Sequence, residues 1–449
     1  MDRISDLPDE ILHHIGSFLS AKEAAFATLL SKRWRSLFTI IPNLHFSGSL
    51  TRAAGGRFKD FADRVLALPV SSRVRTFSLK CKHVARYEDL INRCLRHVLN
   101  RGVLVLELHI KVPRKRHCYY SLPCDVLTCK TVSTMKLGPG FVIEALPADV
   151  FLPALKSLVL DSVRFFAFDG RCSFNTLLSQ SPVLEELVMD GIEFERWKWC
   201  STVSSTTLKR LTIRRREWFS YDETDEENIR VDSRCLTHEF DNVSFHTPAL
   251  TYLEYSDYVP KEYLTVNLDS LVEANLNLWV DEEGVWRPYH ATTFNPMTLI
   301  NGLKHVAILS LTSEAVEMFD VLNESIPMFV MVSQLSLGLS EGCWFSLTNV
   351  IKKFPNLKTL IIEGSVHYDY SEYSCLLSSP VEVLKINEYY GSKNELEQTK
   401  HFLGKLPCLE LVEVCAQATS SEAKLQIMAE LLMIPRASSK CKIQVKFFQ

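Results

Sequence analysis

One short stretch holds the residue types that could bind a metal ion, namely His117, Cys118, Cys124 and Cys129. Imidazole and thiolate groups are the ligands that Zn²⁺ prefers in proteins. The gaps between these residues match none of the usual zinc spacings, and no C-x-x-C pair occurs anywhere in the chain. We therefore interpret them as structural residues, and we expect neither a bound metal nor a cofactor.

The sequence offers no support for catalysis either. The phosphate-binding patterns G-x-x-x-x-G-K-[ST] and G-x-G-x-x-G are absent, and so is the zinc-protease pattern H-E-x-x-H. No local Ser/His/Asp or Cys/His arrangement indicates an activated nucleophile. His13 and His14 fall within a predicted amphipathic helix and are expected at a surface or an interface. The chain is therefore predicted to be non-catalytic.

Charged clusters are the remaining candidates for ligand binding. Two basic groups each follow a predicted strand: Lys111, Arg114, Lys115 and Arg116, then Arg214, Arg215 and Arg216. They could bind a phosphorylated ligand or an acidic segment. We favour a solvated charged rim, with a nuclear-import signal as a further alternative for the first group. The acidic run 222–227 is interpreted as a solvated insertion or a degenerate repeat with an acidic loop, and a role in binding a basic partner is the alternative.

Composition narrows the protein class. The 449 residues are 47% hydrophobic and 23% charged with a net charge of −3, which is ordinary for globular proteins and gives no reason to expect nucleic-acid binding. No run of 18 apolar residues occurs, and acidic residues interrupt the N-terminal segment, so neither a membrane span nor a signal peptide is predicted. The 13 cysteines are an odd number and are interpreted as reduced, mostly buried thiols. We expect the protein in the cytoplasm, the nucleus or both.

Three short helices are predicted at the N-terminus. Asp6 can cap the first helix, Pro8 suits its first position, and an apolar stripe follows at Ile11, Leu12, Ile15, Phe18 and Leu19. Ser20 and Glu23 form a capping box for the second helix. The third carries Trp34, Leu37, Phe38 and Ile41 and is expected to end at Pro42. A unit of this size is usually too small to be stable alone, so it is either a cap of the larger fold or a docking module.

The stretch LPDEILHHIGSFLSAKEAAFATLLSKRWRSL resembles an F-box, the motif that docks on the Skp-family adaptor of cullin–RING ubiquitin ligases. The resemblance includes the L-P-x-E opening, the I-x-x-F-L helix end and the final S-K-R-W-R. It departs from the family at Ser20-Ala21-Lys22, where a proline is usual, and at the small pair Ala24-Ala25. It implies that the adaptor contacts a set of apolar residues: Leu7, Pro8, Ile11, Ile15, Leu19 and Trp34.

A repeat of the form L-x-x-L-x-L fills most of the remaining chain. Clear copies are LKSLVL (155–160), LEELVM (184–189), LKRLTI (208–213) and LKTLII (357–362). Looser copies begin at Val74, Val103, Val132, Leu250, Leu271, Leu303, Val332, Val381 and Leu409. Successive copies are 21 to 32 residues apart, except for one gap of 42. This period is typical of leucine-rich repeats, and parallel strands joined by longer helical crossovers are the less favoured alternative.

The repeat pattern predicts which positions face the core and which face a partner. Positions 1, 4 and 6 should be buried, whereas positions 2, 3 and 5 should line the concave sheet face. The charge at positions 2 and 3 changes sign between neighbouring repeats, from Glu185 and Glu186 to Lys209 and Arg210. These four residues are the candidate target-binding residues, and a purely solubilising role is the alternative.

The C-terminal stretch is expected to cap the solenoid. A helix bearing Leu396, Phe402 and Leu403, a strand, a second helix over 422–433 and a final strand are predicted. The stretch resembles the FBD domain of plant F-box/leucine-rich-repeat proteins, including the P-R-A-S-S-x-C ending.

Together these features predict an α/β protein in three parts. They are an F-box of three helices (1–46), a leucine-rich-repeat solenoid with a curved parallel sheet (47–378) and an FBD-like α/β cap that continues the solenoid (379–449). The resemblance implies the substrate-recognition subunit of an SCF-type ubiquitin ligase. Its partners would be the Skp-family adaptor, through it a cullin, and a protein target. The alternative is a repeat-based interaction scaffold without ubiquitin transfer.

Overall fold

A computed structural model of the chain describes most residues beyond position 39. The described ranges are 7–8, 11, 40–50, 55–68, 73–82, 87–111, 120–139, 141–143, 146–165, 167–168, 171–192, 202–215, 242–280, 294–340, 346–364, 378–418 and 420–448. The chain divides into two compact units, Met1–Ile229 and Arg230–Gln449, which are described separately.

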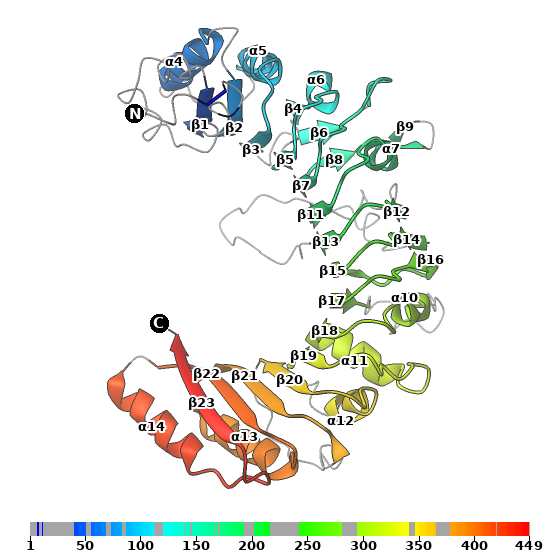
Figure 1. Cartoon of the computed structure of the whole chain (residues 1–449), viewed down its shortest axis with the longest axis vertical. Coiled ribbons are helices and arrows are strands. Elements are labelled where there is room, and N and C mark those ends of the chain that lie inside the picture. Colours follow the sequence, from blue (N-terminus) through cyan, green and yellow to red (C-terminus); the bar gives the residue numbers. More distant parts are fainter. Residues whose placement is uncertain are drawn as a thin grey trace, which may run out of the picture. The chain divides into compact units, whose positions relative to one another are not determined.

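The first unit is built on parallel strands whose order in the sheet follows their order in the sequence (Figure 1). They are β1 (Ile40–Ser49), β2 (Arg73–Lys82), β3 (Val105–Lys111), β5 (Thr134–Leu137), β7 (Ser157–Asp161), β11 (Glu186–Ile192) and β13 (Arg210–Arg215). Neighbouring strands pair in the repeat register, so that Leu158 lies beside Leu187 and Leu187 beside Leu211. Each repeat therefore adds one strand to the sheet.

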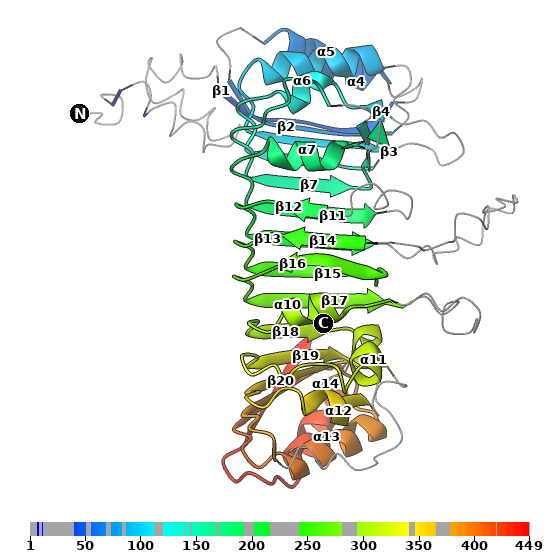
Figure 2. The same ribbon diagram turned by 90° about the vertical axis from the view of Figure 1, so that its right-hand side faces the viewer.

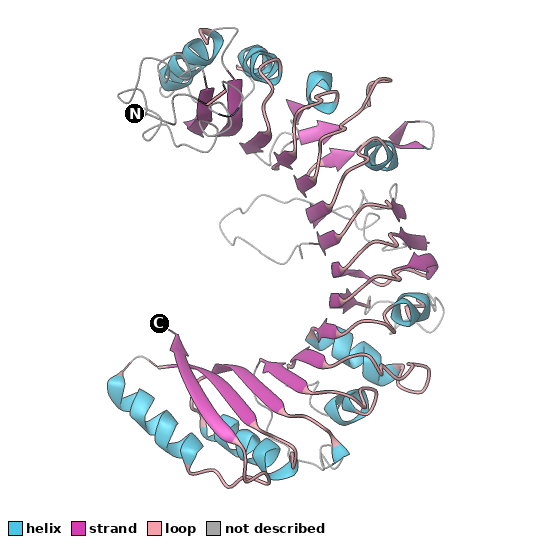
Figure 3. Cartoon of the chain, in the orientation of Figure 1, coloured by secondary structure: helices cyan, strands magenta, loops and turns pink. Residues whose placement is uncertain are grey.

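Short elements connect the strands of the first unit. The helices are α4 (Gly55–Leu66), α5 (Glu88–Leu99), α6 (Cys124–Leu127) and α7 (Ser173–Ser179). The minor strands are β4 (Tyr120–Ser121), β6 (Phe141–Ile143), β8 (Arg164–Phe165), β9 (Ala167–Phe168), β10 (Arg171–Cys172) and β12 (Thr202–Ser204). Helices α5, α6 and α7 lie on one side of the parallel strands (Figure 3). The opposite side of these strands carries no described helix.

The second unit repeats this design with β15 (Tyr252–Tyr258), β17 (Glu273–Trp279), β18 (Ile308–Leu311), β19 (Gln334–Gly338), β20 (Thr359–Glu363), β21 (Val383–Tyr389), β22 (Leu411–Gln417) and β23 (Lys442–Phe448). All neighbours in this series pair in parallel. Figure 2 shows β15 and β17 running in the same direction. The connections contain β14 (Asn242–His246), β16 (Glu262–Asn267), α10 (Met297–Gly302), α11 (Ser313–Val321), α12 (Leu347–Ile351), α13 (Lys393–Lys405) and α14 (Ser421–Leu432). The predicted α/β leucine-rich-repeat solenoid is confirmed.

The core consists of the repeat leucines. At position 4, Leu158, Leu187, Leu211 and Leu360 are each no more than 1% exposed, as predicted. Positions 1 and 6 of the same four repeats are buried as well. Alternation within a strand explains this pattern, because positions 4 and 6 point to one face and positions 3 and 5 to the other.

One predicted repeat is out of register by three residues. The sequence placed a copy at Leu303, but β18 begins at Ile308 and pairs Leu309 with Ala274 and Leu335. The aligned copy is therefore VAILSL, which begins at Val306. Leu303 instead closes α10 as its C-terminal cap and is also buried. The apolar run fits the pattern at both offsets, and pairing with the neighbouring strands selects the second.

The third predicted helix does not reach Ile41, because Ile40–Ser49 forms β1 and pairs with β2. Proline at position 42 disfavours helix at the residue before it, and β-branched isoleucines favour a strand. The segment Ile41–Phe46 also fits the repeat pattern, since Leu44 pairs with Phe77 and Phe46 with Leu79. This repeat was not predicted, because its residues were assigned to the three-helix segment 1–46.

The predicted C-terminal elements are present as α13, β22, α14 and β23. At the start of α13, Ser392 accepts a hydrogen bond from the Glu395 N–H at 3.3 Å. The Glu395 carboxylate in turn accepts from the N–H groups of Ser392 at 2.7 Å and Tyr390 at 3.0 Å. This capping box, together with the Tyr390 contact, anchors the turn between β21 and α13.

We expect Ser392→Ala to lower the free energy of unfolding by about 0.5–2 kcal/mol, since it removes one cap hydrogen bond. Glu395→Ala should cost more, because it leaves two backbone N–H groups without their acceptor. Urea denaturation followed by circular dichroism measures both changes. Lys393→Ala is the matched control on an exposed side chain of the same turn. Equal effects of all three variants would contradict this role of the capping box.

Four of the seven cysteines whose burial is described fit the expectation of buried thiols. Cys81, Cys94, Cys129 and Cys441 are buried and free, and burial raises the pKa of Cys81 to about 12. Cys124 and Cys408 are exposed. Among the described helices, none combines the length and apolar character that a membrane span requires.

Candidate protein-recognition surface

The structure describes three of the six predicted adaptor-binding residues. Pro8 and Ile11 are exposed, Ile11 by 47%, and Leu7 is half-buried. The Ile11 N–H donates to the Pro8 carbonyl at 3.1 Å, as in the first turn of a helix. Ile15, Leu19 and Trp34 lie outside the described residues. Adaptor binding by this stripe therefore stays a prediction.

Within each unit, the side chains at positions 3, 5 and 7 of the repeats line one face of the parallel strands, which we call the recognition face of that unit. In β7 these are Ser157, Val159 and Asp161, and each is half-buried. Position 2 lies just outside the strand, because β11 begins at Glu186 and β13 at Arg210. Glu185 and Lys209 therefore stand at the entry of their strands, whereas Glu186 and Arg210 belong to the recognition face itself.

Two of the four candidate target-binding charges of the first unit contact each other. Glu185 forms an ion pair with Lys209 at 3.3 Å, and both side chains remain about half exposed, at 44% and 58%. Glu186 accepts a hydrogen bond from the Ser157 hydroxyl at 2.7 Å. Exposed ion pairs of this kind contribute little to stability, so the charges stay accessible to a partner.

A second charged group lies on β3 and β5. Glu107 and Lys136 form an ion pair at 3.1 Å. Burial acts to raise the pKa of Glu107, but the hydrogen bond and charge of Lys136 and the charge of Lys80 outweigh it and lower the pKa below its usual value. Glu107 is therefore a carboxylate at neutral pH and adds a fixed negative charge to the recognition face.

In the second unit, uncharged polar side chains occupy position 7 of β15 and β17, whereas Glu254 and Glu273 stand at positions 5 and 3 of these strands. The Asn277 amide donates to the Ser256 hydroxyl at 3.1 Å and accepts from the Thr312 hydroxyl at 2.8 Å. These bonds fix the orientation of the amide across three neighbouring repeats. Such a pre-ordered amide loses little conformational entropy when a partner binds.

An aromatic pair adjoins this polar tract, and the sequence analysis missed it. The rings of Tyr258 and Trp279 lie 5.5 Å apart on paired positions of β15 and β17. Tyrosine and tryptophan dominate the binding energy of many protein interfaces. A signal was available in the sequence, because each aromatic follows the first leucine of its repeat by eight residues, Leu250 and Leu271 respectively.

A group of paired charges lies at the C-terminal end of the second unit. Glu413 on β22 pairs with Lys385 on β21 and Lys446 on β23, each at 3.2 Å. Hydrogen bonds from Lys385 and then Lys446 hold the pKa of Glu413 below its usual value. The recognition face of the second unit therefore carries an aromatic pair on β15 and β17 and a group of three paired charges on β21, β22 and β23.

The other clusters singled out in the sequence have different outcomes. Arg214 contacts Asp190 at 3.9 Å, but Arg215 is only 4% exposed, so it is no part of a solvated rim. Strand alternation explains this, since Arg215 points to the face opposite Arg214. Lys111 ends β3, while 114–116, Arg216, the acidic run 222–227, His117 and Cys118 lie outside the described residues. No group of three potential metal ligands occurs in the described ranges.

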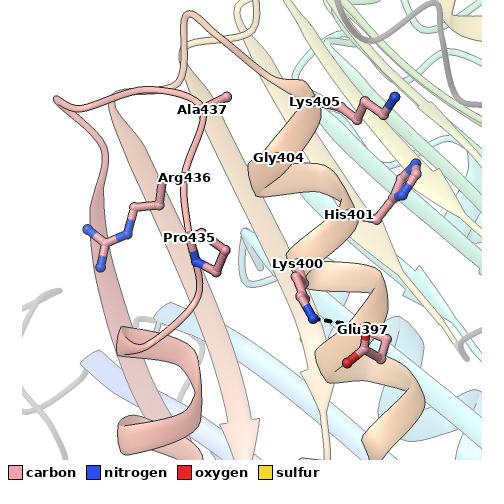
Figure 4. A pocket seen from close by; sticks show the side chains of 8 residues that line it. All are labelled: Glu397, Lys400, His401, Gly404, Lys405, Pro435, Arg436 and Ala437. Atoms are coloured by element: carbon pink, nitrogen blue, oxygen red, sulfur yellow. Dashed lines mark hydrogen bonds and ion pairs between the residues drawn. The ribbon is translucent and has the colours of Figure 1, made fainter.

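A groove of about 620 Å³ lies between α13 and the segment Pro435–Ala437 (Figure 4). Three of its charged side chains are already engaged. Lys400 contacts Glu397 at 3.5 Å, and the Arg436 guanidinium donates to the carbonyls of Cys441 and Leu432. Burial, assisted by Lys405, lowers the pKa of His401 and so favours the neutral imidazole. We therefore assign the groove a packing role.

Comparison with known proteins decides the family. Residues 4–46 match the F-box domain, and residues 91–247 match the family described as "FBD-associated F-box protein At5g56370, LRR repeats". The F-box/LRR-repeat protein At3g62440 of Arabidopsis thaliana is 51% identical over 99% of this chain and its own full length. The chain belongs to the F-box/LRR-repeat family. The putative F-box/LRR-repeat protein At5g15620 of the same plant is 48% identical over the full length of both chains.

Membership confirms the resemblance drawn from the sequence. The F-box/LRR-repeat family in general supplies substrate adaptors to SCF ligases, and the F-box domain implies binding to a Skp-family adaptor. Members of this family are typically non-catalytic. The recognition face belongs to the repeats that follow the F-box in such proteins.

Proposed function

We propose that this chain is the substrate-recognition subunit of an SCF-type cullin–RING ubiquitin ligase. The N-terminal helices bind the Skp-family adaptor and thereby a cullin, while the recognition face holds a protein target. The chain performs no chemistry itself. It places a lysine of the target close to a ubiquitin-charged enzyme, and proximity alone raises the effective concentration of the two reactants.

This proposal is supported by the order of the F-box and the repeats along the chain. An F-box match at 4–46 precedes a repeat array with an accessible polar and aromatic face. The alternative is a scaffold that binds the same target without ubiquitin transfer. Two departures from the usual F-box pattern, at Ser20-Ala21-Lys22 and at Ala24-Ala25, favour that alternative, because both fall in the segment that would bind the adaptor.

Reconstitution separates the two functions. The full chain is mixed with adaptor, cullin–RING complex, conjugating enzyme and a target captured from plant extract. Ubiquitin chains on that target support the proposal, whereas stable adaptor-free binding without modification supports the scaffold. Capture uses a chain with a disabled F-box, which should retain targets that would otherwise be degraded.

We expect reversal of the charges at Glu185 and Glu186 to lysine to weaken target capture at least tenfold, which corresponds to about 1.4 kcal/mol. The reason is that a partner matched to the acidic pair would meet like charge. Quantitative pull-down of captured targets measures the change, and adaptor binding should remain unaffected.

The exchange Glu185→Lys with Lys209→Glu is the matched control, because it keeps an ion pair at 185 and 209 while it inverts the surface pattern. Loss of capture in both variants assigns the effect to recognition rather than to local stability. If both variants capture every target as well as the unaltered chain does, the target binds elsewhere. The Tyr258–Trp279 pair is then the next surface to test.

A further inference from the structure

Among the strands that the structure describes, the last strand of the second unit has a neighbour on one edge only. Strand β23 pairs with β22 on one side, and no other described strand pairs with it. The Lys442 N–H donates to the Glu410 carbonyl at 2.9 Å, so residue 442 directs its peptide groups toward β22. Successive residues of a strand direct these groups to opposite edges, so those of Ile443, Val445 and Phe447 face the open edge. Such an edge is a template for another strand.

The helix beside this strand leaves part of its apolar surface uncovered. Ile427 and Leu431 are the buried residues of α14. Leu425, Met428 and Leu432 are exposed by 68%, 39% and 51%. Their spacing of i, i+3 and i+7 makes them one stripe along the helix. We call these three residues the α14 stripe.

Helical geometry places the α14 stripe toward the open edge. Ile427 points to Gly391 at the end of β21, since a Cβ built there would lie 2.8 Å from its side chain. Lys424, about 60° further round the helix, lies over the Phe447 ring of β23 at 5.5 Å. Measured from Ile427 around the helix axis in the same direction, Met428 lies at about 100°, Leu432 at about 140° and Leu425 at about 160°. These three side chains therefore point beyond β23. The apolar layer under α14 therefore continues past the last strand.

The side chains of β23 are divided by type. The face of β23 toward α14 carries three half-buried apolar residues, Ile443, Val445 and Phe447. The opposite face carries the exposed residues Lys442, Gln444, Lys446 and Phe448. Charged edge residues commonly prevent edge-to-edge pairing. Here Lys446 is held back over the sheet by Glu413, at 3.2 Å. The α14 side of the edge thus carries no lysine of β23.

We propose that β23 is a homodimerisation strand, which pairs antiparallel with β23 of a second copy of this chain about a two-fold axis at Val445. Val445 then faces Val445 of the partner, and Ile443 faces Phe447 in both directions. All three are residues whose peptide groups point to the open edge, so each opposed pair exchanges two hydrogen bonds. The sheet would continue through the dimer.

The sequence of β23 is complementary to itself in this register, and this selects a second copy as the occupant. The apolar residues of both strands fall on one face, beneath the two α14 stripes. On the other face Gln444 lies opposite Lys446 and Lys442 opposite Phe448, so no like charges stand directly across from each other. The contact is isologous and closes as a dimer.

Val445→Pro tests the pairing in the full-length chain. Proline removes the outward N–H, while the bonds of β23 to β22 come from residues 442, 444 and 446 and remain. We expect sedimentation equilibrium to give the mass of two chains for the unaltered protein and of one chain for the variant. A monomeric unaltered chain at micromolar concentration, or a dimer that survives Val445→Pro, would overturn the proposal.

Val445→Cys tests the register without breaking the strand. Opposed Cα atoms of a hydrogen-bonded antiparallel pair are about 5.5 Å apart, which suits a disulfide. Mild oxidation should give a disulfide-linked dimer on a non-reducing gel, above the background of the native cysteines. Gln444→Cys should not, since its symmetry mate is offset along the strand. Equal cross-linking of the two variants would refute the register.

Leu425→Glu and Gln426→Glu form a matched pair on α14. Both positions are exposed, but only Leu425 belongs to the α14 stripe. We expect Leu425→Glu to raise the dimer dissociation constant at least tenfold and Gln426→Glu to change it less than twofold. If the two variants change the dissociation constant equally, the α14 stripe is not part of the interface. None of these measurements depends on adaptor binding, so they stand apart from the test of the ubiquitin-ligase role.

Discussion

Replacement of Leu7 and Pro8 by alanine should abolish binding of the Skp-family adaptor. Pro8 is exposed and Leu7 is half-buried at the start of the F-box helix, where Ile11 is 47% exposed. Apolar anchors at the centre of an interface commonly contribute 2 kcal/mol or more each, so we expect a loss of affinity of about 100-fold or greater. Co-purification with the adaptor and titration calorimetry measure this loss.

Ser17→Ala is the matched control for this experiment, since the helical pattern places Ser17 opposite the apolar stripe. It should bind the adaptor as the unaltered chain does. The thermal unfolding of the repeats should be the same in both variants, because the core leucines lie outside the F-box. If the same amount of adaptor co-purifies with the Leu7/Pro8 variant, the assignment of these residues to the adaptor interface is wrong.

Substitution of a repeat leucine should have the largest effect on stability. Leu187 is fully buried in β11 and pairs with Leu158 and Leu211 on either side. Leu187→Ala removes buried methyl groups and leaves a cavity that neighbouring repeats fill only in part. We expect it to lower the free energy of unfolding by about 2–5 kcal/mol. Urea denaturation, with the transition followed by tryptophan fluorescence, measures the change.

The neighbouring residue provides the comparison. Val188 occupies position 5 of the same strand and is half-buried on the recognition face. Val188→Ala should cost about 1 kcal/mol or less, because the site it leaves opens to solvent. A Val188→Ala cost that equals or exceeds that of Leu187→Ala would contradict the assignment of the two faces.

Features encoded by local spacing were predictable from the sequence. The L-x-x-L-x-L pattern identified Leu158, Leu187, Leu211 and Leu360 as core residues, and all four are buried. Alternation along a strand and the repeat period need no knowledge of distant residues. The C-terminal helices and strands were predicted for the same reason.

Features that depend on pairing between strands needed the tertiary structure. The run LKHVAILSL fits the repeat pattern at two offsets, and only pairing with β17 and β19 selects Val306 over Leu303. The Glu185–Lys209 ion pair, the Tyr258–Trp279 contact and the open edge of β23 each join or expose residues of different repeats. The sequence determined what each repeat buries, because that depends on neighbours three to six residues away. Strand register decided which side chains meet on the recognition face, because that depends on residues 21 to 35 positions away.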